Sequence, residues 1–493
     1  MANTQGEPVN GDEITVGNVE GVGIAIGTGA SVKIYGDVHY YPITLRAPLR
    51  EVFDPLLENR TALFAGRDAV LAQIGEFIQN PAGGYLVITA PAGFGKTALM
   101  ANLVSRTPQA FAYHFFTSTY VADGLSEDFF LRNVVEQMAE WHGHKGVLPS
   151  TLHELSALYH KFLDEPLGRT QVLVLDGLDE VASWKLNQYL SRRAPPQLHI
   201  ILTLRDLGQN WTREYGLPVD QIEHLPLGGL NRDEVAQVLK AAGQDAVVFA
   251  EDARLLNEVM RISAYQADEA LGADPFYVRL LAEDVAEGRL TPENIADQPQ
   301  GLDAYLDTWW QEVKKLAGDQ PARDLFGTLT VALGPICRAD LEAINPSLVD
   351  EWAEDYFEDV LNQVRRCVVG DAIHGYSLAH PRLQQYMRTR IKAGSYQEEV
   401  LSYCANWQKH RSPYALAHYA QHLAEAERAG DLQKLVKSRT WTRAKYVDTP
   451  WITSLIEDLQ LASEIVGGKD IQSWACSMGY QLRRSIIKKS RCP

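Results

Sequence analysis

The chain has 493 residues, a formal net charge of −17, and a composition that is 46% hydrophobic and 22% charged. The length suits several domains and the composition suits a globular protein with a large core, so a single small module and an extensively disordered chain are both excluded. No stretch of 18 apolar residues is present, and the first residues carry neither the basic start nor the apolar segment of a signal peptide. We therefore expect a cytoplasmic protein that does not span a membrane.

The net charge indicates which partners are disfavoured, and the cysteine spacing indicates the redox state of the thiols. So acidic a surface repels a phosphodiester backbone, so nucleic acid is not expected to be the main partner. A basic run near residue 490 is either a solvated helix end or a local patch, and it comprises Arg483, Arg484, Lys488, Lys489 and Arg491. The five cysteines lack any paired spacing, which predicts reduced thiols. They are Cys337, Cys367, Cys404, Cys476 and Cys492.

Residues 1–45 form a glycine-rich segment with β-branched residues at alternate positions. Val22, Ile24 and Ile26 illustrate this pattern, which predicts short strands broken by turns and excludes a helix. The stretch GVGIAIGTGAS resembles glycine-punctuated β-solenoid repeats and amyloid-type signalling motifs. Because the segment is too short to bury a core, it is a flexible leader, a self-assembling element or a docking site for a partner.

A proline-bearing linker over residues 46–60 leads to an alternation of strands and helices over residues 61–228. The expected strands are 85–90, 111–116, 170–176 and 199–206, and the expected helices are 95–106, 127–142 and 184–193. Such alternation predicts an α/β fold, with a parallel sheet covered by helices on both faces.

After about residue 230 the pattern becomes helical. Residues 229–300 are expected to form a small helical domain, with helices at 231–243 and 275–288. Residues 301–393 contain helices, then two short strands at 365–370 and 375–379, which is typical of a winged helix. The remainder, 394–493, is expected to be a C-terminal helical domain that includes a helical hairpin over 414–436.

The strongest motif is a phosphate-binding loop between the first strand and the first helix of the core. It comprises Ala90, Pro91, Ala92, Gly93, Phe94, Gly95, Lys96, Thr97 and Ala98. The two glycines allow backbone N–H groups to turn toward phosphates, and the helix N-terminus adds its dipole. Lys96 is expected to reach the β- and γ-phosphates of ATP, and Thr97 to bind Mg²⁺.

Acidic residues follow a buried strand about 80 residues later. Asp176 ends the strand at the sheet edge beside the P-loop, where it is expected to hold Mg²⁺. Asp179 and Glu180 follow, and Glu180 is placed to orient or deprotonate a water molecule. The alternative is an acidic loop after a buried strand.

The next apolar strand also ends in a charged residue, Arg205. At the same sheet edge, Arg205 is expected to sense the γ-phosphate and to stabilise charge during phosphoryl transfer. The alternative is a structural ion pair with Asp206 or Asp176.

This set of motifs resembles the STAND class of P-loop ATPases, which are signalling switches that include the NACHT and NB-ARC groups. The entry motif of the class is matched by Phe64, Ala65, Gly66 and Arg67, so the resemblance places Gly66 and Arg67 at the nucleotide. The form LDGLDE, with Gly177, is similar to NACHT rather than NB-ARC proteins. The stretch HLPLGGLNRDE resembles the junction between strand and helix that follows the core of the class.

The resemblance also implies two contacts from outside the core. Pro275 matches the proline that packs on adenine, although one extra residue separates it from Gly272. His380 matches the winged-helix histidine that contacts the β-phosphate of ADP and keeps the switch closed. These likenesses span about residues 60–440.

The resemblance implies a slow ATPase that binds ATP or ADP with Mg²⁺ and acts in defence, programmed cell death or transcriptional signalling. Exchange of ADP for ATP would open the molecule, which would then self-associate and recruit an effector or sensor protein. One alternative is a cycling AAA-like remodelling ATPase. Another is a nucleotide-regulated transcription regulator, which the acidic helix RADLEAIN disfavours.

Overall fold

The computed structural model describes residues 48–466, apart from short gaps. The gaps are residues 122–123, 145, 150, 166, 182–183, 191–192, 206–210, 268–270, 350–355, 373 and 449–452. The glycine-rich segment 1–45 and the basic run beyond residue 466 therefore lie outside the described residues, as do Asp206, Cys476 and Cys492. Within the described part, Cys337, Cys367 and Cys404 are free thiols.

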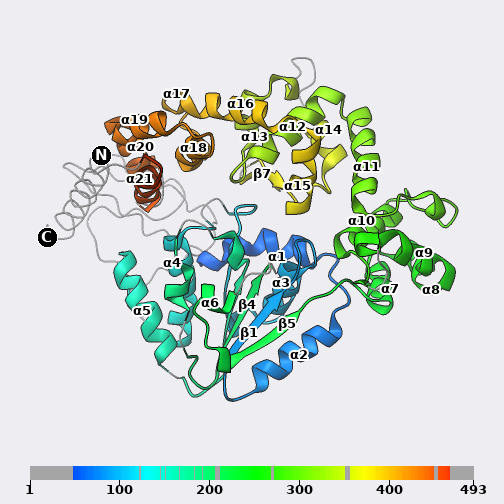
Figure 1. The fold of residues 1–493 in the computed structure, drawn as a ribbon, viewed down its shortest axis with the longest axis horizontal. Helices are drawn as coiled ribbons and strands as arrows, with labels where there is room; N and C mark the ends of the chain where they lie inside the picture. The colour runs from blue at the N-terminus through cyan, green and yellow to red at the C-terminus, as the bar shows by residue number, and fades with distance from the viewer. Residues whose placement is uncertain are drawn as a thin grey trace, which may run out of the picture. The chain divides into compact units, whose positions relative to one another are not determined.

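A five-stranded parallel sheet organises the first half of the described chain (Figure 1). Its strands are β1 (Gly84–Thr89), β2 (Phe111–Phe115), β3 (Gln171–Asp176), β4 (Leu198–Leu204) and β5 (Ile222–Pro226). The order in the sheet is β2-β3-β4-β1-β5. Strands β1, β3 and β4 are buried along their whole length, which explains why they are mainly apolar in the sequence.

Helices cover both faces of this sheet, as expected. They are α2 (Asp68–Gln79), α3 (Lys96–Arg106), α4 (Glu127–Trp141) and α5 (Leu152–Asp164), with the short α6 (Trp211–Glu214) before β5. Alternate side chains of β1 enter different cores. Leu86 packs in the cluster that contains Leu99 of α3, whereas Val87 packs in the cluster that contains Phe130 of α4 and Tyr159 of α5. The α/β prediction is confirmed.

The stretch expected to be a linker is instead part of the folded core. A 3₁₀ turn (Leu49–Phe53) leads into α1 (Asp54–Thr61), which contacts α3. Phe53 and Leu56 are fully buried. Pro55 is compatible with helix here because it occupies the first turn, where no backbone N–H is needed. Reading the prolines as linker signals was therefore wrong.

The helix expected over residues 184–193 is also wrong. The described residues of this stretch form a 3₁₀ turn (Leu186–Tyr189), and the next residue, Leu190, is extended. Tyr189 donates a hydrogen bond of 2.5 Å to Glu127 at the start of α4, and its ring is buried. This tertiary anchoring outweighs the local helical pattern.

The small helical domain follows β5. It contains α7 (Arg232–Ala241), α8 (Gln244–Glu251), α9 (Ala253–Ser263) and α10 (Pro275–Ala286). A capping box starts α7, in which Asn231 and Glu234 each bond the backbone N–H of the other. Asp274 caps α10 by accepting from the N–H groups of Phe276 and Tyr277.

The winged helix has the expected order of helices followed by a hairpin. Its helices are α11 (Leu302–Leu316), α12 (Asp319–Val331), α13 (Arg338–Ile344) and α14 (Tyr356–Val364). Strands β6 (Val368–Asp371) and β7 (Gly375–Leu378) pair antiparallel and lead into α15 (Pro381–Arg390). Asp340 of α13 is buried, where it accepts hydrogen bonds from Tyr403 and Ser412.

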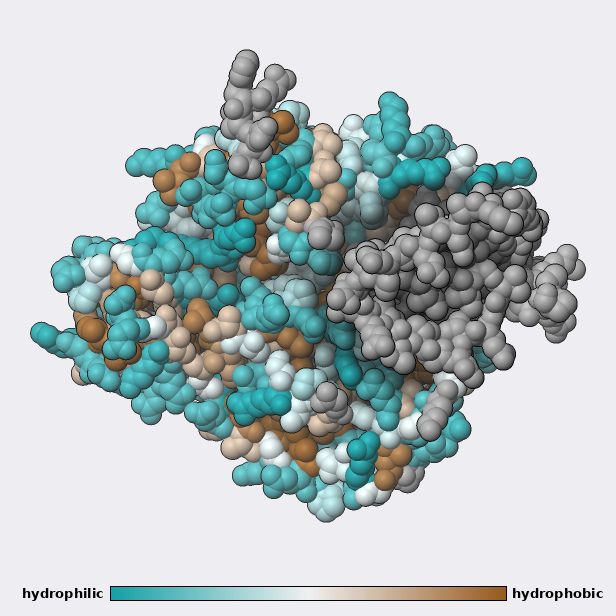
Figure 2. Space-filling model, turned by 180° about the vertical axis from the view of Figure 1, so that it is seen from behind, coloured by the Kyte–Doolittle hydropathy of each residue, from teal (hydrophilic) through white to brown (hydrophobic). Residues whose placement is uncertain are grey.

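The chain continues as helices to the last described residue. They are α16 (Ala393–Ala405), α17 (Trp407–His410), α18 (Pro413–Glu425), α19 (Ala429–Lys437), α20 (Arg439–Asp448) and α21 (Thr453–Val466). Helices α18 and α19 contact each other, as the expected hairpin requires. No helix within the described ranges is long and apolar enough to cross a membrane. On the face shown in Figure 2, hydrophobic residues are scattered in small groups among hydrophilic ones.

Candidate nucleotide-binding site

The P-loop joins β1 to α3, and its two glycines have conformations that require glycine. Gly93 has φ of 87° and Gly95 has φ of 84°, both in the left-handed region. Gly95 caps the N-terminus of α3. A Cβ added to Gly93 would lie 2.7 Å from Cδ of Arg382 and 3.1 Å from Cε1 of His380, so the winged helix approaches the loop closely at this point.

Lys96 is the first residue of α3, and its side chain turns back over the loop. The ammonium group donates to the carbonyl oxygens of Ala90 at 2.8 Å and of Pro91 at 3.1 Å. Burial lowers the pKa of Lys96, and the neighbouring carboxylate of Asp176 opposes that shift. Lys96 is thus held at the phosphate-binding loop, and no carboxylate among the described residues pairs with it directly, which leaves its charge available to an anion.

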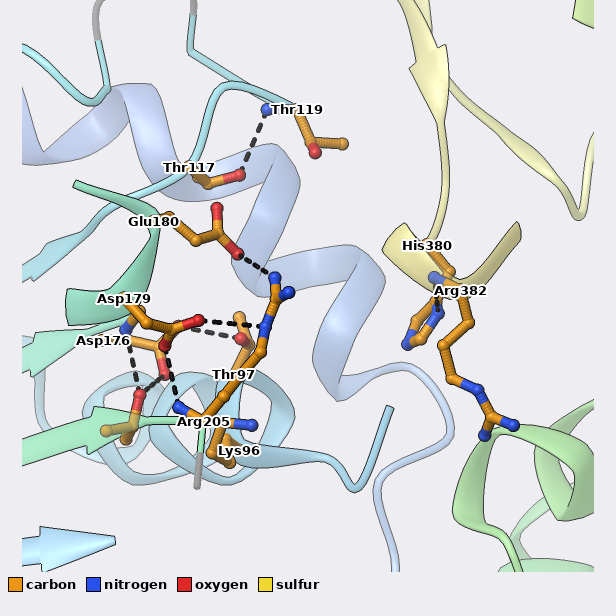
Figure 3. A network of polar contacts seen from close by, with 12 residues as sticks. Lys96, Thr97, Thr117, Thr119, Asp176, Asp179, Glu180, Arg205, His380 and Arg382 are labelled. Carbon is orange, nitrogen blue, oxygen red and sulfur yellow. Dashed lines mark hydrogen bonds and ion pairs between the residues drawn. The ribbon is translucent and has the colours of Figure 1, made fainter. Parts of the chain in front are cut away.

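Asp176 receives hydroxyl hydrogen bonds from two different elements (Figure 3). Thr97 of α3 donates to one carboxylate oxygen at 2.8 Å, and Thr203 of β4 donates to the other at 2.6 Å. Burial raises the pKa of Asp176, and these two hydrogen bonds act in the opposite direction. The predicted magnesium ligands, Thr97 and Asp176, are therefore in direct contact.

Thr203 was not found from the sequence. Besides binding Asp176, it accepts a hydrogen bond of 2.9 Å from the N–H of Gly177, so it fixes the path of the chain just after β3. The available signal was a hydroxyl residue two positions before Arg205 in an otherwise apolar strand.

We expect Thr203→Val to lower the free energy of unfolding by about 1–3 kcal/mol, because it leaves buried polar groups of Asp176 and Gly177 without a partner. Chemical denaturation checks this. The matched control is Thr308→Val on the exposed face of α11, where a change within about 0.5 kcal/mol is expected. Equal effects of the two substitutions would contradict the role assigned to Thr203.

Arg205 forms an ion pair with the acidic residues after β3. Its Nε lies 2.9 Å from Asp179 and an Nη atom lies 3.6 Å from Glu180, while its backbone N–H donates to Asp179 at 2.9 Å (Figure 3). Arg205 therefore does form a structural ion pair, which was the alternative to phosphate sensing. Its partners are Asp179 and Glu180 rather than Asp176. Asp206 lies outside the described residues.

The carboxyl group of Glu180 has an unusual proton affinity. Burial, with repulsion from Asp176 and Asp179, raises its pKa to about 7, and Arg205 opposes this shift. The side chain keeps 32% of its surface exposed, so a water molecule can reach it. A carboxylate with a pKa near neutral pH is suited to accept a proton from water.

Gly66 and Arg67 lie where β5 and α7 meet the core. Both have positive φ, at 78° and 66°. The guanidinium of Arg67 donates to the carbonyl oxygens of Gly228 at 2.7 Å and of Gly229 at 3.4 Å, and its backbone N–H donates to Glu234 at 3.2 Å. Arg67 lines the cavity described below, but its hydrogen bonds join the start of α2 to the junction between β5 and α7.

His380 is a neutral cap on α15. Its Nδ1 accepts a hydrogen bond of 3.1 Å from the N–H of Arg382, and burial, with repulsion from Arg60 and other cations, holds its pKa well below the usual range. The remaining proton is therefore on Nε2. The imidazole stacks on Phe276, with ring centroids 3.9 Å apart and planes at 12°. Phe276, which the sequence did not indicate, follows Pro275 at the start of α10.

Gly272 has a structural role. A Cβ at this position would lie 2.9 Å from the backbone of Gly229, and the neighbouring Ala273 bonds Leu230 in both directions. The glycine therefore allows two backbone segments to approach, and it does not line the cavity beside the P-loop.

Part of the core matches a known family, and a larger part of the chain resembles solved structures weakly. Residues 72–205 match the family described as Nephrocystin 3, N-terminal. Cdc6p from Pyrobaculum aerophilum is 14% identical, with 71% of this chain and 87% of that chain covered and a TM-score of 0.31. The ORC2 protein of Aeropyrum pernix is 16% identical, with coverages of 72% and 97% and a TM-score of 0.32. The ORC1 protein of Aeropyrum pernix, solved in complex with DNA, is 13% identical, with coverages of 69% and 96% and a TM-score of 0.30.

The core is a P-loop NTPase domain. The parallel sheet, the glycine loop between β1 and α3, and Asp176 at the end of β3, which is separated from β1 by β4, support this conclusion. The TM-scores are too low to add an argument about activity or partners. The expectation that nucleic acid is not the main partner therefore stays a prediction.

A cavity beside the P-loop brings most of the predicted site residues together. Those lining it are Arg67, Ala92, Gly93, Phe94, Gly95, Lys96, Thr97, Ala98, Asp176, Asp179, Glu180, Arg205, Pro275 and His380. Its wall does not include Ala90, Pro91 or Gly66, which act through the backbone around it. The sequence did not indicate Arg60, Leu63, Tyr120, Leu230, Val238, Phe276 and Arg279, which also line it.

The residues of the cavity fit a nucleotide. Cationic side chains and the glycine loop offer donors to a polyphosphate, and the hydroxyl of Thr97 with the carboxylate of Asp176 offers oxygen ligands for Mg²⁺. Leu230, Val238 and Pro275 form an apolar part of the wall that suits a planar base.

Proposed function

We propose that this protein is an ATP- and ADP-dependent signalling switch of the STAND type, with a NACHT-like acidic motif. In the proposed cycle, ADP holds the P-loop domain against the winged helix, and exchange for ATP releases that contact. The open form self-associates and recruits an effector or sensor protein. Slow hydrolysis resets the switch, and the proposed setting is cytoplasmic signalling in defence or programmed cell death.

The contact between the winged helix and the P-loop carries this proposal. His380 and Arg382 lie against Gly93, which has no room for a Cβ. Arg382 also forms an ion pair with Asp274, the residue that caps α10. The winged helix therefore touches the P-loop and the small helical domain at the cavity, so a ligand there can govern the placement of all three.

Each wall of the cavity has a part in nucleotide binding under this proposal. Bound ATP supplies the phosphoanhydride bond whose cleavage resets the switch. Lys96 and the N–H groups of the P-loop hold its phosphates, and Thr97 with Asp176 holds Mg²⁺. Pro275 packs on the base, and the Nε2 proton of His380 is available to a phosphate oxygen.

Hydrolysis and sensing fall to the acidic cluster. Glu180 accepts a proton from the attacking water, for which its raised pKa suits it. Arg205 is held by Asp179 and Glu180 and can exchange these partners for the γ-phosphate. Because that exchange breaks an ion pair, we expect turnover to be slow.

The first test is the nucleotide content of the protein purified without added nucleotide. We expect close to one ADP per chain in the denatured extract, and we expect His380→Ala to release it at least about tenfold faster because a contact to phosphate is lost. The matched control is His153→Ala on the exposed surface of α5. Light scattering after addition of a non-hydrolysable ATP analogue should show self-association.

An empty protein that hydrolyses added ATP rapidly would contradict the switch. That result would favour the cycling AAA-like remodelling ATPase, the second candidate that the P-loop NTPase domain allows. Strong, salt-dependent binding to DNA would instead favour the transcription regulator.

A further inference from the structure

Arg60 of α1 connects the cavity to the winged helix. One of its Nη atoms donates a hydrogen bond of 2.9 Å to the carbonyl oxygen of Ala379, the residue before His380. Its Nε atom is buried and has no hydrogen-bond partner among the residues that the structure describes. The side chain also lines the cavity beside the P-loop. Arg60 therefore contacts the winged helix with one edge of its guanidinium and keeps an unused donor.

The charge of Arg60 has no carboxylate partner among the residues that the structure describes, which sets it apart from the other arginines at the cavity. Those arginines pair with Glu234 (Arg67), Asp179 (Arg205) and Glu283 (Arg279), and Arg382, which lies beside Gly93 of the P-loop, pairs with Asp274. The guanidinium of Arg60 lies 5.8 Å from the ring centroid of Tyr120, which is a weak partner for a cation. Arg60 is part-buried and its Nε is shielded from solvent, and a shielded cation without a counter-ion is costly, so this site calls for an anion.

Burial lowers the pKa of Arg60, and the neighbouring Arg279 adds to this shift. Asp176 and Glu180 act in the opposite direction, and both line the same cavity as Arg60, on the side with the predicted magnesium ligands and water-activating carboxyl group. In an NTPase, this is the side at which the last phosphate of ATP is cleaved.

We propose that Arg60 signals the presence of the γ-phosphate to the winged helix. With ADP, its guanidinium holds the carbonyl of Ala379, as in this structure. With ATP, it turns to the γ-phosphate, because a phosphate adds an opposite charge and can accept two parallel bonds from the guanidinium, which the carbonyl cannot. Loss of the bond to Ala379 frees the segment that contains His380. The inference rests on the proposed switch and names the residue that couples the nucleotide site to the winged helix.

The test compares Arg60→Gln with wild type in two measurements. The first is the affinity for ADP and for a fluorescent non-hydrolysable ATP analogue. We expect the analogue to bind at least about tenfold more weakly and ADP less than about threefold more weakly, because only the analogue has the phosphate that Arg60 contacts. The second is hydrogen exchange of the backbone amides in residues 375–390. In wild type, exchange should be faster with the analogue than with ADP, and in the variant this difference should disappear.

The matched control is Arg50→Gln, which removes an arginine of the preceding 3₁₀ turn that pairs with Glu140. It should behave as wild type. If wild type binds neither nucleotide, or shows the same exchange with both, the proposed switch fails. If wild type distinguishes them and Arg60→Gln does so equally well, the switch stands and the role of Arg60 is overturned.

Arg60→Lys keeps the test decisive if Arg60→Gln does not fold. Lysine retains the charge but lacks the planar fork, so it cannot bind Ala379 and a phosphate with the same geometry. We expect the preference for the analogue over ADP to fall at least about threefold relative to wild type. An unchanged preference would overturn the proposal.

Discussion

Replacing Glu180 with glutamine is expected to slow ATP hydrolysis by at least about 100-fold, because the amide cannot accept the proton of the attacking water. Nucleotide binding should change little, since Lys96, Thr97 and Asp176 keep their contacts. Single-turnover hydrolysis and equilibrium binding of ADP measure the two effects separately. The matched control is Glu223→Gln, on an exposed position of β5, which should hydrolyse ATP as wild type does.

The pH dependence of hydrolysis gives an independent check on this role. The pKa of Glu180 is about 7, and a general base works only when it is deprotonated. The wild-type rate should therefore fall as the pH drops below about 7 and level off above it. The residual hydrolysis rate of Glu180→Gln should not show this step, which is the fall in rate near pH 7. The same step in both proteins would assign the titration to another group.

Replacing Lys96 with alanine is expected to weaken the binding of ADP and ATP by at least about 100-fold, because hydrogen bonds from a charged donor contribute about 1.5–3 kcal/mol each. The fold should survive, since within the described part of the chain the ammonium bonds to the carbonyl oxygens of Ala90 and Pro91 and to no other group. Calorimetric binding and the rise in Tm with added ADP measure the loss.

Lys161→Ala on α5 is the control for the removal of one positive charge, because Lys161 is 62% exposed and far from the P-loop in the sequence. It should bind both nucleotides as wild type does. Unchanged affinity in Lys96→Ala would contradict the phosphate-binding role of this loop, and with it the proposed switch.

The strands of the core could be predicted because their signal is local. Strands β1, β3 and β4 are buried along their whole length, so each appears as a mainly apolar run. Helix α3 follows a glycine that can adopt a positive φ, and α7 begins at a capping box. Parallel strands end at one sheet edge, which is why Asp176 and Arg205 could be expected near the P-loop.

Two predictions, the helix over residues 184–193 and the linker, are wrong for a common reason. The helix expected over residues 184–193 is replaced by a 3₁₀ turn because Tyr189 bonds Glu127, which is far away in the chain. The expected linker is helical because Phe53 and Leu56 find a core that only the folded sheet provides. In both places, burial and hydrogen bonding to distant residues outweigh local propensity.

The sequence by itself determined the P-loop, the acidic strand end and the order of α/β core, winged helix and helical arm, because these depend on local residue patterns. Only the tertiary structure decided which charges are already paired. It joins Arg205 to Asp179, brings Thr203 to Asp176, and leaves Arg60 facing the cavity with an unused donor. Such pairings depend on distances between residues far apart in the chain, and no spacing in the sequence encodes those distances.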